Sequence, residues 1–168
     1  MSQDVILGFH QMLEMCKDGT LKVCEKVKPE DRFHQLKEGK AHPLWLLGHL
    51  ANTIDVVGNL WTYNQQPIVA KKYKLKFAPD FANGDPITTD PENYPRWEEL
   101  LEDYATGFDA FLKNVRETQD AELPESPRGP VREDRKDFFN SIGKNIQVMI
   151  LHDTHHRGQM AMISKLNG

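Results

Sequence analysis

Four segments of the chain repeat apolar residues at the spacing of one helix face, and this repeat constrains the fold more than any other feature of the sequence. Proline marks their limits: Pro29 follows the first segment, Pro67 ends the second and Pro95 begins the third. No two segments show the alternation that a convincing pair of strands requires. The pattern predicts four amphipathic helices, over about residues 3–27, 42–66, 95–115 and 136–166.

Four such helices predict an all-α protein with the architecture of a four-helix bundle. The connection 66–94, between the second and third helices, holds four prolines and the turn signal Asn83-Gly84. A connection of that length can cross the bundle, which makes the two helices parallel and the order up-down-down-up. A second long connection, 119–135, joins the third and fourth helices, and the period-two alternation of residues 72–77 predicts a short extended piece.

Chain length and net charge further limit the class of protein to which the sequence can belong. The 168 residues suit a single domain over 1–168, because a chain of this size buries one sizeable core. The net charge of -4 does not provide the positive field that non-specific nucleic-acid binding needs. No apolar run reaches the about 18 residues of a membrane span, and the N-terminal sequence lacks the pattern of a signal peptide. We therefore expect a cytoplasmic protein that binds neither nucleic acid nor a membrane.

Both cysteines, Cys16 and Cys24, fall in the first predicted helix. Eight residues along a helix correspond to a rise of about 12 Å, which exceeds the reach of a disulfide. We expect two reduced thiols, as is usual in the cytoplasm. Cys16 lies on the apolar stripe, where a thiol is usually inert, so neither cysteine is expected to be catalytic.

Three histidines lie where an apolar residue is expected. His152 and His156 are four residues apart on the apolar face of the fourth predicted helix, so both imidazoles can reach one ion. His49 lies on the apolar stripe of the second predicted helix. If these two helices are antiparallel neighbours, the three side chains lie at the same height in the bundle.

Imidazole suits zinc, nickel, copper and iron(II), and three histidines with an open fourth position are typical of a reactive metal centre. The alternative is that these are core histidines whose ring nitrogens are bonded within the protein. A pair at helical spacing, together with a third on a facing stripe, favours the metal. The other histidines are interpreted as structural or flanking residues: His10, His34, His42 and His155.

The segment 152–156 also invites comparison with the HExxH motif of zinc metalloproteases. Asp153 stands at the position of the general base, one methylene shorter than the usual glutamate, and no third ligand follows downstream. The pattern therefore disfavours a protease.

Two motifs resemble those of one family, the DinB-like superfamily of DinB/YfiT-like metalloenzymes. The motif LHDTHHRGQMAMI, residues 151–163, resembles the family's last-helix motif, and HPLWLLGHLANTID, residues 42–55, resembles its second-helix motif. The stretch 81–100 is similar to the family's entry to the third helix. The order and separation of the two histidine motifs make the resemblance specific.

The resemblance implies an up-down-down-up four-helix bundle, often a homodimer, with nickel or zinc bound by His49, His152 and His156. It also implies an enzyme, most simply a thiol-dependent S-transferase that joins a low-molecular-weight thiol to a small electrophile. The same open site would suit a metal-dependent hydrolase, because a metal ion also ionises water. A third hypothesis is a non-catalytic, stress-related protein that binds a metal ion.

Residues near the three histidines are candidates for supporting roles. Asn52 and Asp153 are candidate hydrogen-bond partners of the imidazole N–H groups, and Gln159 lies where it would orient a bound water. Arg157 is expected to pair with a carboxylate of a neighbouring helix, and a carboxylate of a thiol cofactor is the alternative partner. Apolar residues beyond one stripe per helix suggest the homodimer surface, and the interior of a larger bundle is the competing explanation: Leu47, Leu50, Val57, Phe138 and Phe139.

Overall fold

The computed structural model describes residues 4–166, and within them it contains helices and no strands, which confirms the all-α class. Short 3-10 turns occur in the connections. Residue 3, the expected start of the first helix, and the expected cap at Asn167 and Gly168 lie outside the described residues. The five α-helices are α1 (Asp4–Lys26), α2 (Pro43–Thr53), α3 (Val69–Tyr73), α4 (Trp97–Glu117) and α5 (Ile142–Leu166).

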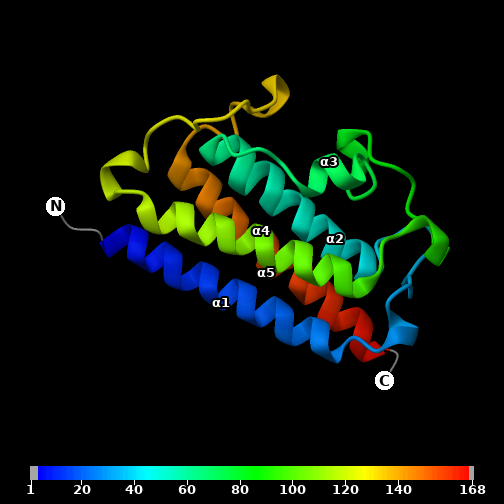
Figure 1. The fold of residues 1–168 in the computed structure, drawn as a ribbon. Helices are drawn as coiled ribbons and strands as arrows, with labels where there is room; N and C mark the ends of the chain where they lie inside the picture. Colours follow the sequence, from blue (N-terminus) through cyan, green and yellow to red (C-terminus); the bar gives the residue numbers. More distant parts are fainter. Residues whose placement is uncertain (1–3, 167–168) are drawn as a thin grey trace.

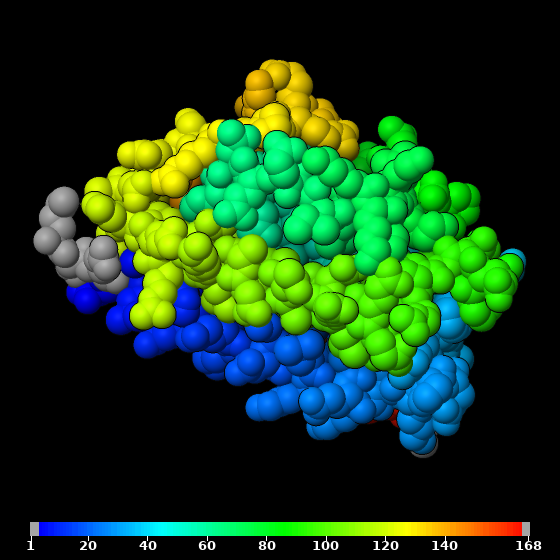
Figure 2. Space-filling model, viewed as in Figure 1, coloured from blue at the N-terminus to red at the C-terminus, as the bar shows by residue number. Residues whose placement is uncertain are grey.

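The four long helices lie side by side (Figure 1). Helices α1 and α5 run in one direction, and α2 and α4 run in the other. Each long helix packs against two others, because α1 and α2 both contact α4 and α5. Figure 2 shows one face of the molecule, on which α1 and α4 extend side by side. Helices α2 and α5 are therefore antiparallel neighbours, which is the arrangement that a shared histidine site requires.

The core forms because each long helix buries one stripe of apolar side chains. Helix α4 shows this most clearly, since its buried residues recur every three or four positions. Tyr104, Phe108 and Phe111 lie fully inside, next to residues of α1 and α5 such as Leu13 and Ile146. One continuous apolar cluster joins the four long helices.

Helix α2 continues into a π-helical segment, η2 (Ile54–Trp61). The connection 119–135 docks at the end of this segment, where Gly129 and Arg128 donate backbone N–H bonds to the carbonyls of Trp61 and Thr62. A Cβ atom on Gly129 would lie 1.9 Å from the carbonyl oxygen of Leu60, so only glycine allows this approach. These bonds supply hydrogen-bond donors to carbonyl groups at the end of the helix that would otherwise lack a partner.

The extended piece predicted over 72–77 is wrong, because residues 69–73 form α3 and residues 74–77 form a turn. The side chain of Asp55 caps α3 from a distant part of the chain: its carboxylate accepts the backbone N–H groups of Ile68 and Ala70 at 3.0 Å. Lys72 then pairs with carboxylates of α4. A tertiary cap of this kind leaves no periodic signal in the sequence.

Helix α5 begins at Ile142, six residues later than predicted. Residues 133–135 form a 3-10 turn instead, and Phe139 N–H bonds back to the carbonyl of Arg135. Ser141 caps the helix, because its hydroxyl oxygen accepts the N–H of Lys144.

Two further expectations concern cysteines and membranes. Cys16 and Cys24 are both free and buried, and they form no disulfide, as predicted. Across residues 4–166, no helix has both the length and the apolar character needed to cross a membrane.

Candidate metal centre

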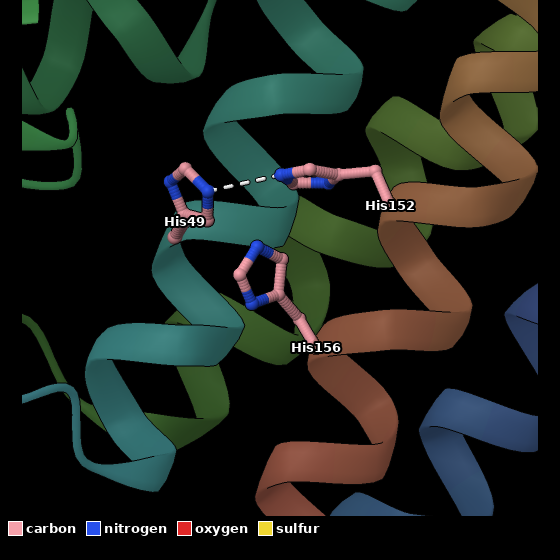
Figure 3. A group of neighbouring side chains, drawn as sticks. All are labelled: His49, His152 and His156. Carbon is pink, nitrogen blue, oxygen red and sulfur yellow. Dashed lines mark hydrogen bonds between the residues drawn. The ribbon is translucent and has the colours of Figure 1, made fainter. Parts of the chain in front are cut away.

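Three histidines from two helices meet between α2 and α5 (Figure 3). His49 extends from α2, and His152 and His156 extend from α5, with their rings turned toward one another. One nitrogen of each ring lies within 4.8 Å of the others, and Nε2 of His49 is 3.0 Å from Nε2 of His152. The structure thus brings together the three residues that the sequence selected.

His49 is held by one residue of its own helix, Trp45, and by one that is distant in the sequence, Phe77. Its Nδ1 lies 2.8 Å from the carbonyl oxygen of Phe77, and the Trp45 ring stacks on it at 4.8 Å between centroids. Trp45 is itself fixed, because its indole N–H donates to the carbonyl of Lys76. A Cβ atom on Gly48 would come within 2.3 Å of the Phe77 ring, so glycine is required beside the histidine. The connection 66–94 therefore helps to orient His49.

The hydrogen-bond partners determine which ring nitrogen is free. A carbonyl oxygen can only accept, so the Nδ1 of His49 carries the hydrogen that is donated to Phe77. The Nδ1 of His156 likewise donates to Oε1 of Gln159 at 2.7 Å. Both rings are left with the lone pair on Nε2, as in metal sites where the second ring nitrogen is bonded to a carbonyl group.

Burial keeps the three imidazoles neutral. Desolvation lowers the pKa of His49 to about 4, although its bond to Phe77 opposes this change. The pKa of His152 falls to about 2 through burial and the nearby rings of His49 and His156, and burial also lowers the pKa of His156. Neutral rings offer lone pairs at pH 7, so an ion would not compete with protons for them.

The donor set fits a divalent ion. In a tetrahedral zinc site with bonds of about 2.0–2.1 Å, neighbouring ligand nitrogens lie about 3.3 Å apart. The 3.0 Å separation of the His49 and His152 Nε2 atoms is close to that value. The group has three members among the described residues, which leaves coordination positions for a ligand from solution.

The three candidate supporting residues differ in whether they contact an imidazole ring. Gln159 contacts His156 directly. Asp153 is bonded to Thr20 and Tyr104 and, among the described residues, to no imidazole, so the structure gives it a different setting from the one expected. Asn52 is half-buried on α2 and has no hydrogen bond to a ring within the described chain.

Asp153 and Tyr104 form a buried polar contact. Burial raises the pKa of the Asp153 carboxyl, and the hydroxyl groups of Tyr104 and Thr20 oppose that rise. Burial and the adjacent carboxyl raise the pKa of the Tyr104 hydroxyl far above its usual range. Tyr104 therefore remains a hydrogen-bond donor at all ordinary pH values.

Among the described residues Arg157 forms no ion pair with a carboxylate, which differs from the structural pairing expected from the sequence. Its guanidinium donates to the backbone carbonyls of Met15 and Cys16 at 3.5 and 3.4 Å. The group lies against Gly19, where a Cβ atom would come within 2.3 Å of it. A glycine on α1 thus makes room for an arginine of α5, a pairing that a search for opposite charges cannot find.

The remaining histidines have other settings. His42 is buried, accepts the N–H of Trp45 at the start of α2 and lies 2.9 Å from the carbonyl oxygen of Thr88. His155 is exposed beside His156, as a flanking residue would be. His10 pairs with Glu14 one turn along α1. His42 is therefore a structural residue, as predicted.

Only one of the two long connections reaches the histidines. The connection 66–94 supplies Phe77, whereas 119–135 docks at Trp61 and Thr62, twelve and thirteen residues along the chain from His49. Among the described residues, 66–94 is therefore the connection that contributes to the histidine site. A cleft of about 330 Å³ lies elsewhere, between η2, α3 and α4, and none of the three histidines lines it.

The residues offered as a second apolar face are mostly interior. Leu47, Leu50 and Val57 are buried within the chain itself, which favours an interior position over a dimer surface for them. Phe138 is exposed and Phe139 is half-buried against Trp61. Helix α2 and its continuation η2 therefore bury Leu47, Leu50 and Val57 inside the chain and do not present them to a partner.

The fold and the site define a class: a helical protein with a three-histidine group that could bind a metal ion. The sequence profile of the DinB superfamily matches residues 12–160, which is most of the chain, and the protein belongs to this superfamily. Comparison with curated proteins finds no significant match.

Proposed function

We propose that the protein is a metal-dependent enzyme, a thiol-dependent S-transferase that uses nickel or zinc held by His49, His152 and His156. The observation that carries the proposal is the convergence of three neutral imidazoles with no fourth protein ligand among the described residues. A divalent ion supplies positive charge that favours the ionised form of a thiol or water molecule coordinating it. A small-molecule electrophile would then be the second substrate.

The chain's own residues hold the ligands in one orientation. The Phe77 carbonyl and Gln159 keep the hydrogens of His49 and His156 on Nδ1, so that both Nε2 lone pairs face the same point. The stacked Trp45 ring limits rotation of His49 and keeps water from one of its faces. Preorganisation of this kind removes the need to reorder the rings when a ligand arrives.

The thiol is the part of the proposal that rests on the family resemblance. Hydrolysis of an ester or amide suits the same geometry, and a non-catalytic metal-binding protein would share the ligands. The test compares thiol consumption with ester hydrolysis for metal-loaded wild-type protein and for His156→Ala, over several thiols and electrophiles. Thiol consumption that disappears in the variant supports the transferase; ester cleavage without thiol turnover contradicts it.

The proposal extends to the whole molecule. It takes residues 1–168 as a single domain, an up-down-down-up four-helix bundle that works in the cytoplasm, where free thiols such as Cys16 and Cys24 persist. It also includes a homodimer, which is supported by exposed apolar side chains on the neighbouring helices α1 and α5. These are Val5, Met12 and Met15 on α1 and Leu151 and Met162 on α5.

The dimer is tested by light scattering at micromolar concentration. Wild-type protein is expected at twice the mass of the chain, and Met15→Glu combined with Leu151→Glu at the mass of one chain. Phe81→Glu, which changes an exposed aromatic residue outside both helices, is the matched control. A monomeric wild-type protein would contradict this part of the proposal.

A further inference from the structure

One buried carboxylate ties α5 to two other helices beside the histidine pair. Asp153 follows His152 in the sequence and is 3% exposed. Its Oδ1 accepts a hydrogen bond from the Thr20 hydroxyl of α1 at 2.8 Å, and its Oδ2 accepts one from the Tyr104 hydroxyl of α4 at 2.7 Å. We call Thr20, Tyr104 and Asp153 the Asp153 network. Each carboxylate oxygen thus has one donor, and each donor comes from a different helix.

We propose that the Asp153 network is a positioning device, which fixes the rotation of α5 so that His152 and His156 face His49. This inference rests on the proposed metal function and adds to it a role for residues that contact neither the ligand nitrogens nor a substrate. Asp153 is a positioning residue in this account, because it acts on the histidines through the helix that carries them.

The geometry explains why rotation matters. At 3.6 residues per turn, Asp153 points about 80° away from the mean direction of His152 and His156, toward the inside of the bundle. A ring nitrogen lies roughly 7 Å from its helix axis, so a rotation of about 15° would move it by about 2 Å. That displacement equals the length of a whole zinc–nitrogen bond of about 2 Å. A small rotation of α5 about its axis would therefore move His152 and His156 out of bonding distance of an ion held by His49.

Directional bonds give the network its influence over rotation. Apolar side chains tolerate small shifts, whereas a hydrogen bond weakens steeply when its angle or length changes. Thr20 and Tyr104 are both fully buried, so neither can replace a lost bond with water. Apart from the contact between His49 and His152 itself, the bond from Asn145 of α5 to Thr62 lies farther along the helix, and the bond from Arg157 to Cys16 is longer.

The test removes one hydroxyl at a time and reads the site in two ways. Tyr104→Phe and Thr20→Val each delete one donor, and they avoid the folding risk of changing the buried carboxylate itself. Tyr63→Phe is the matched control, because its hydroxyl bonds to Thr118 at 3.0 Å, away from α5. The first reading is Co²⁺ affinity and its visible spectrum, and the second is the ¹⁵N ring spectrum of the histidines in metal-free protein. Chemical denaturation of each variant measures any general loss of stability.

The network variants are expected to bind Co²⁺ about tenfold more weakly, with shifted visible bands and altered ring signals of His152 and His156. Tyr63→Phe should leave the Co²⁺ affinity, the visible spectrum and the ring signals unchanged. Wild-type affinity, spectrum and ring signals in folded Tyr104→Phe and Thr20→Val would overturn the positioning role. If wild-type protein binds no Co²⁺, the metal function fails; the ring spectra still decide the positioning role, because they need no metal.

Discussion

Helix α2 and its continuation η2 border two polar regions: the three-histidine group at His49 and the acidic cleft at Asp55. In the cleft, the carboxylate of Asp55 accepts backbone N–H groups of the α3 segment, and carboxylates of α4 bond to Lys72 and Tyr73. At the histidines, Nδ1 of His49 and of His156 is bonded, and the two rings lie 4.8 Å apart between centroids.

The comparison teaches how to distinguish a ligand site from a structural contact. Three carboxylates of the cleft, those of Asp55, Glu99 and Asp103, are bonded to residues of the α3 segment, so they hold α3 in place. The Nε2 lone pairs of the histidines have no hydrogen donor other than another imidazole among the described residues, and this leaves them available to an ion. Both regions are polar and partly buried, and the difference lies in which atoms already have partners.

The largest expected effect is the loss of a ligand. His152→Ala should weaken Ni²⁺ or Zn²⁺ binding by more than about a hundredfold, since even the loss of a partner behind a ligand can reach that value. Competition with a chelator measures the affinity. Asp55→Asn, on the cleft side, is the control and should retain wild-type affinity. Equal affinities of His152→Ala and wild-type protein would remove the distinction between the two regions.

Acidification should destabilise the metal-free protein through the same histidines. Their unfolded pKa is about 6.5, whereas burial lowers the pKa of His49 to about 4, so the unfolded chain binds more protons between these values. Stability is therefore lost as the pH falls from 6.5 toward 4, by about 1.4 kcal/mol per pH unit for each such histidine. Urea denaturation at several pH values should give a shallower slope for His49→Gln. Identical slopes would mean that His49 is not neutral in the folded state.

A substitution at Gly48, beside His49, tests the comparison between the histidine group and the cleft without removing a metal ligand. Gly48→Ala forces the Phe77 ring to move, and we expect it to disturb the carbonyl that orients His49. Metal affinity should fall about tenfold, and the unfolding free energy should fall by about 1–3 kcal/mol. Gly8→Ala is the matched control, because nothing lies within 4 Å of the added Cβ atom. A Gly48→Ala protein with unchanged affinity would show that the Phe77 carbonyl is dispensable.

The smallest effect is expected in the cleft. Lys72 pairs with Glu99 at 2.6 Å and with Asp103 at 3.1 Å, but its side chain is 39% exposed. Solvent screens such pairs, so Lys72→Met should lower the unfolding free energy by about 0.5 kcal/mol. Metal affinity should not change, as isothermal calorimetry would show. A large loss of affinity would mean that α3 transmits its position to His49 through the turn 74–77.

The sequence predicted the parts of the molecule that depend on periodicity. The helical stripes identified the four long helices, and the spacing of His152 and His156 placed both on one side of α5. The antiparallel packing of α2 and α5 then brought His49 to them. These features follow from residue type and position along one helix.

Other features depend on contacts that no local pattern contains. The bond from His49 to Phe77 uses a backbone carbonyl, which every residue has, so the sequence could not single it out. The setting of Asp153 depends on the rotation of α5 against α1 and α4, and a spacing rule applied to one helix does not give that rotation. Helix α3 depends on the distant cap from Asp55.

The most direct test of the central claim is the metal content of the protein together with its ligand set. Purified protein should hold one nickel or zinc ion per chain, and X-ray absorption should show three histidine nitrogens bound to it. The triple variant with His49, His152 and His156 each changed to alanine should hold none while it keeps its helical circular dichroism. A triple variant with the metal content of the wild-type protein would contradict the account.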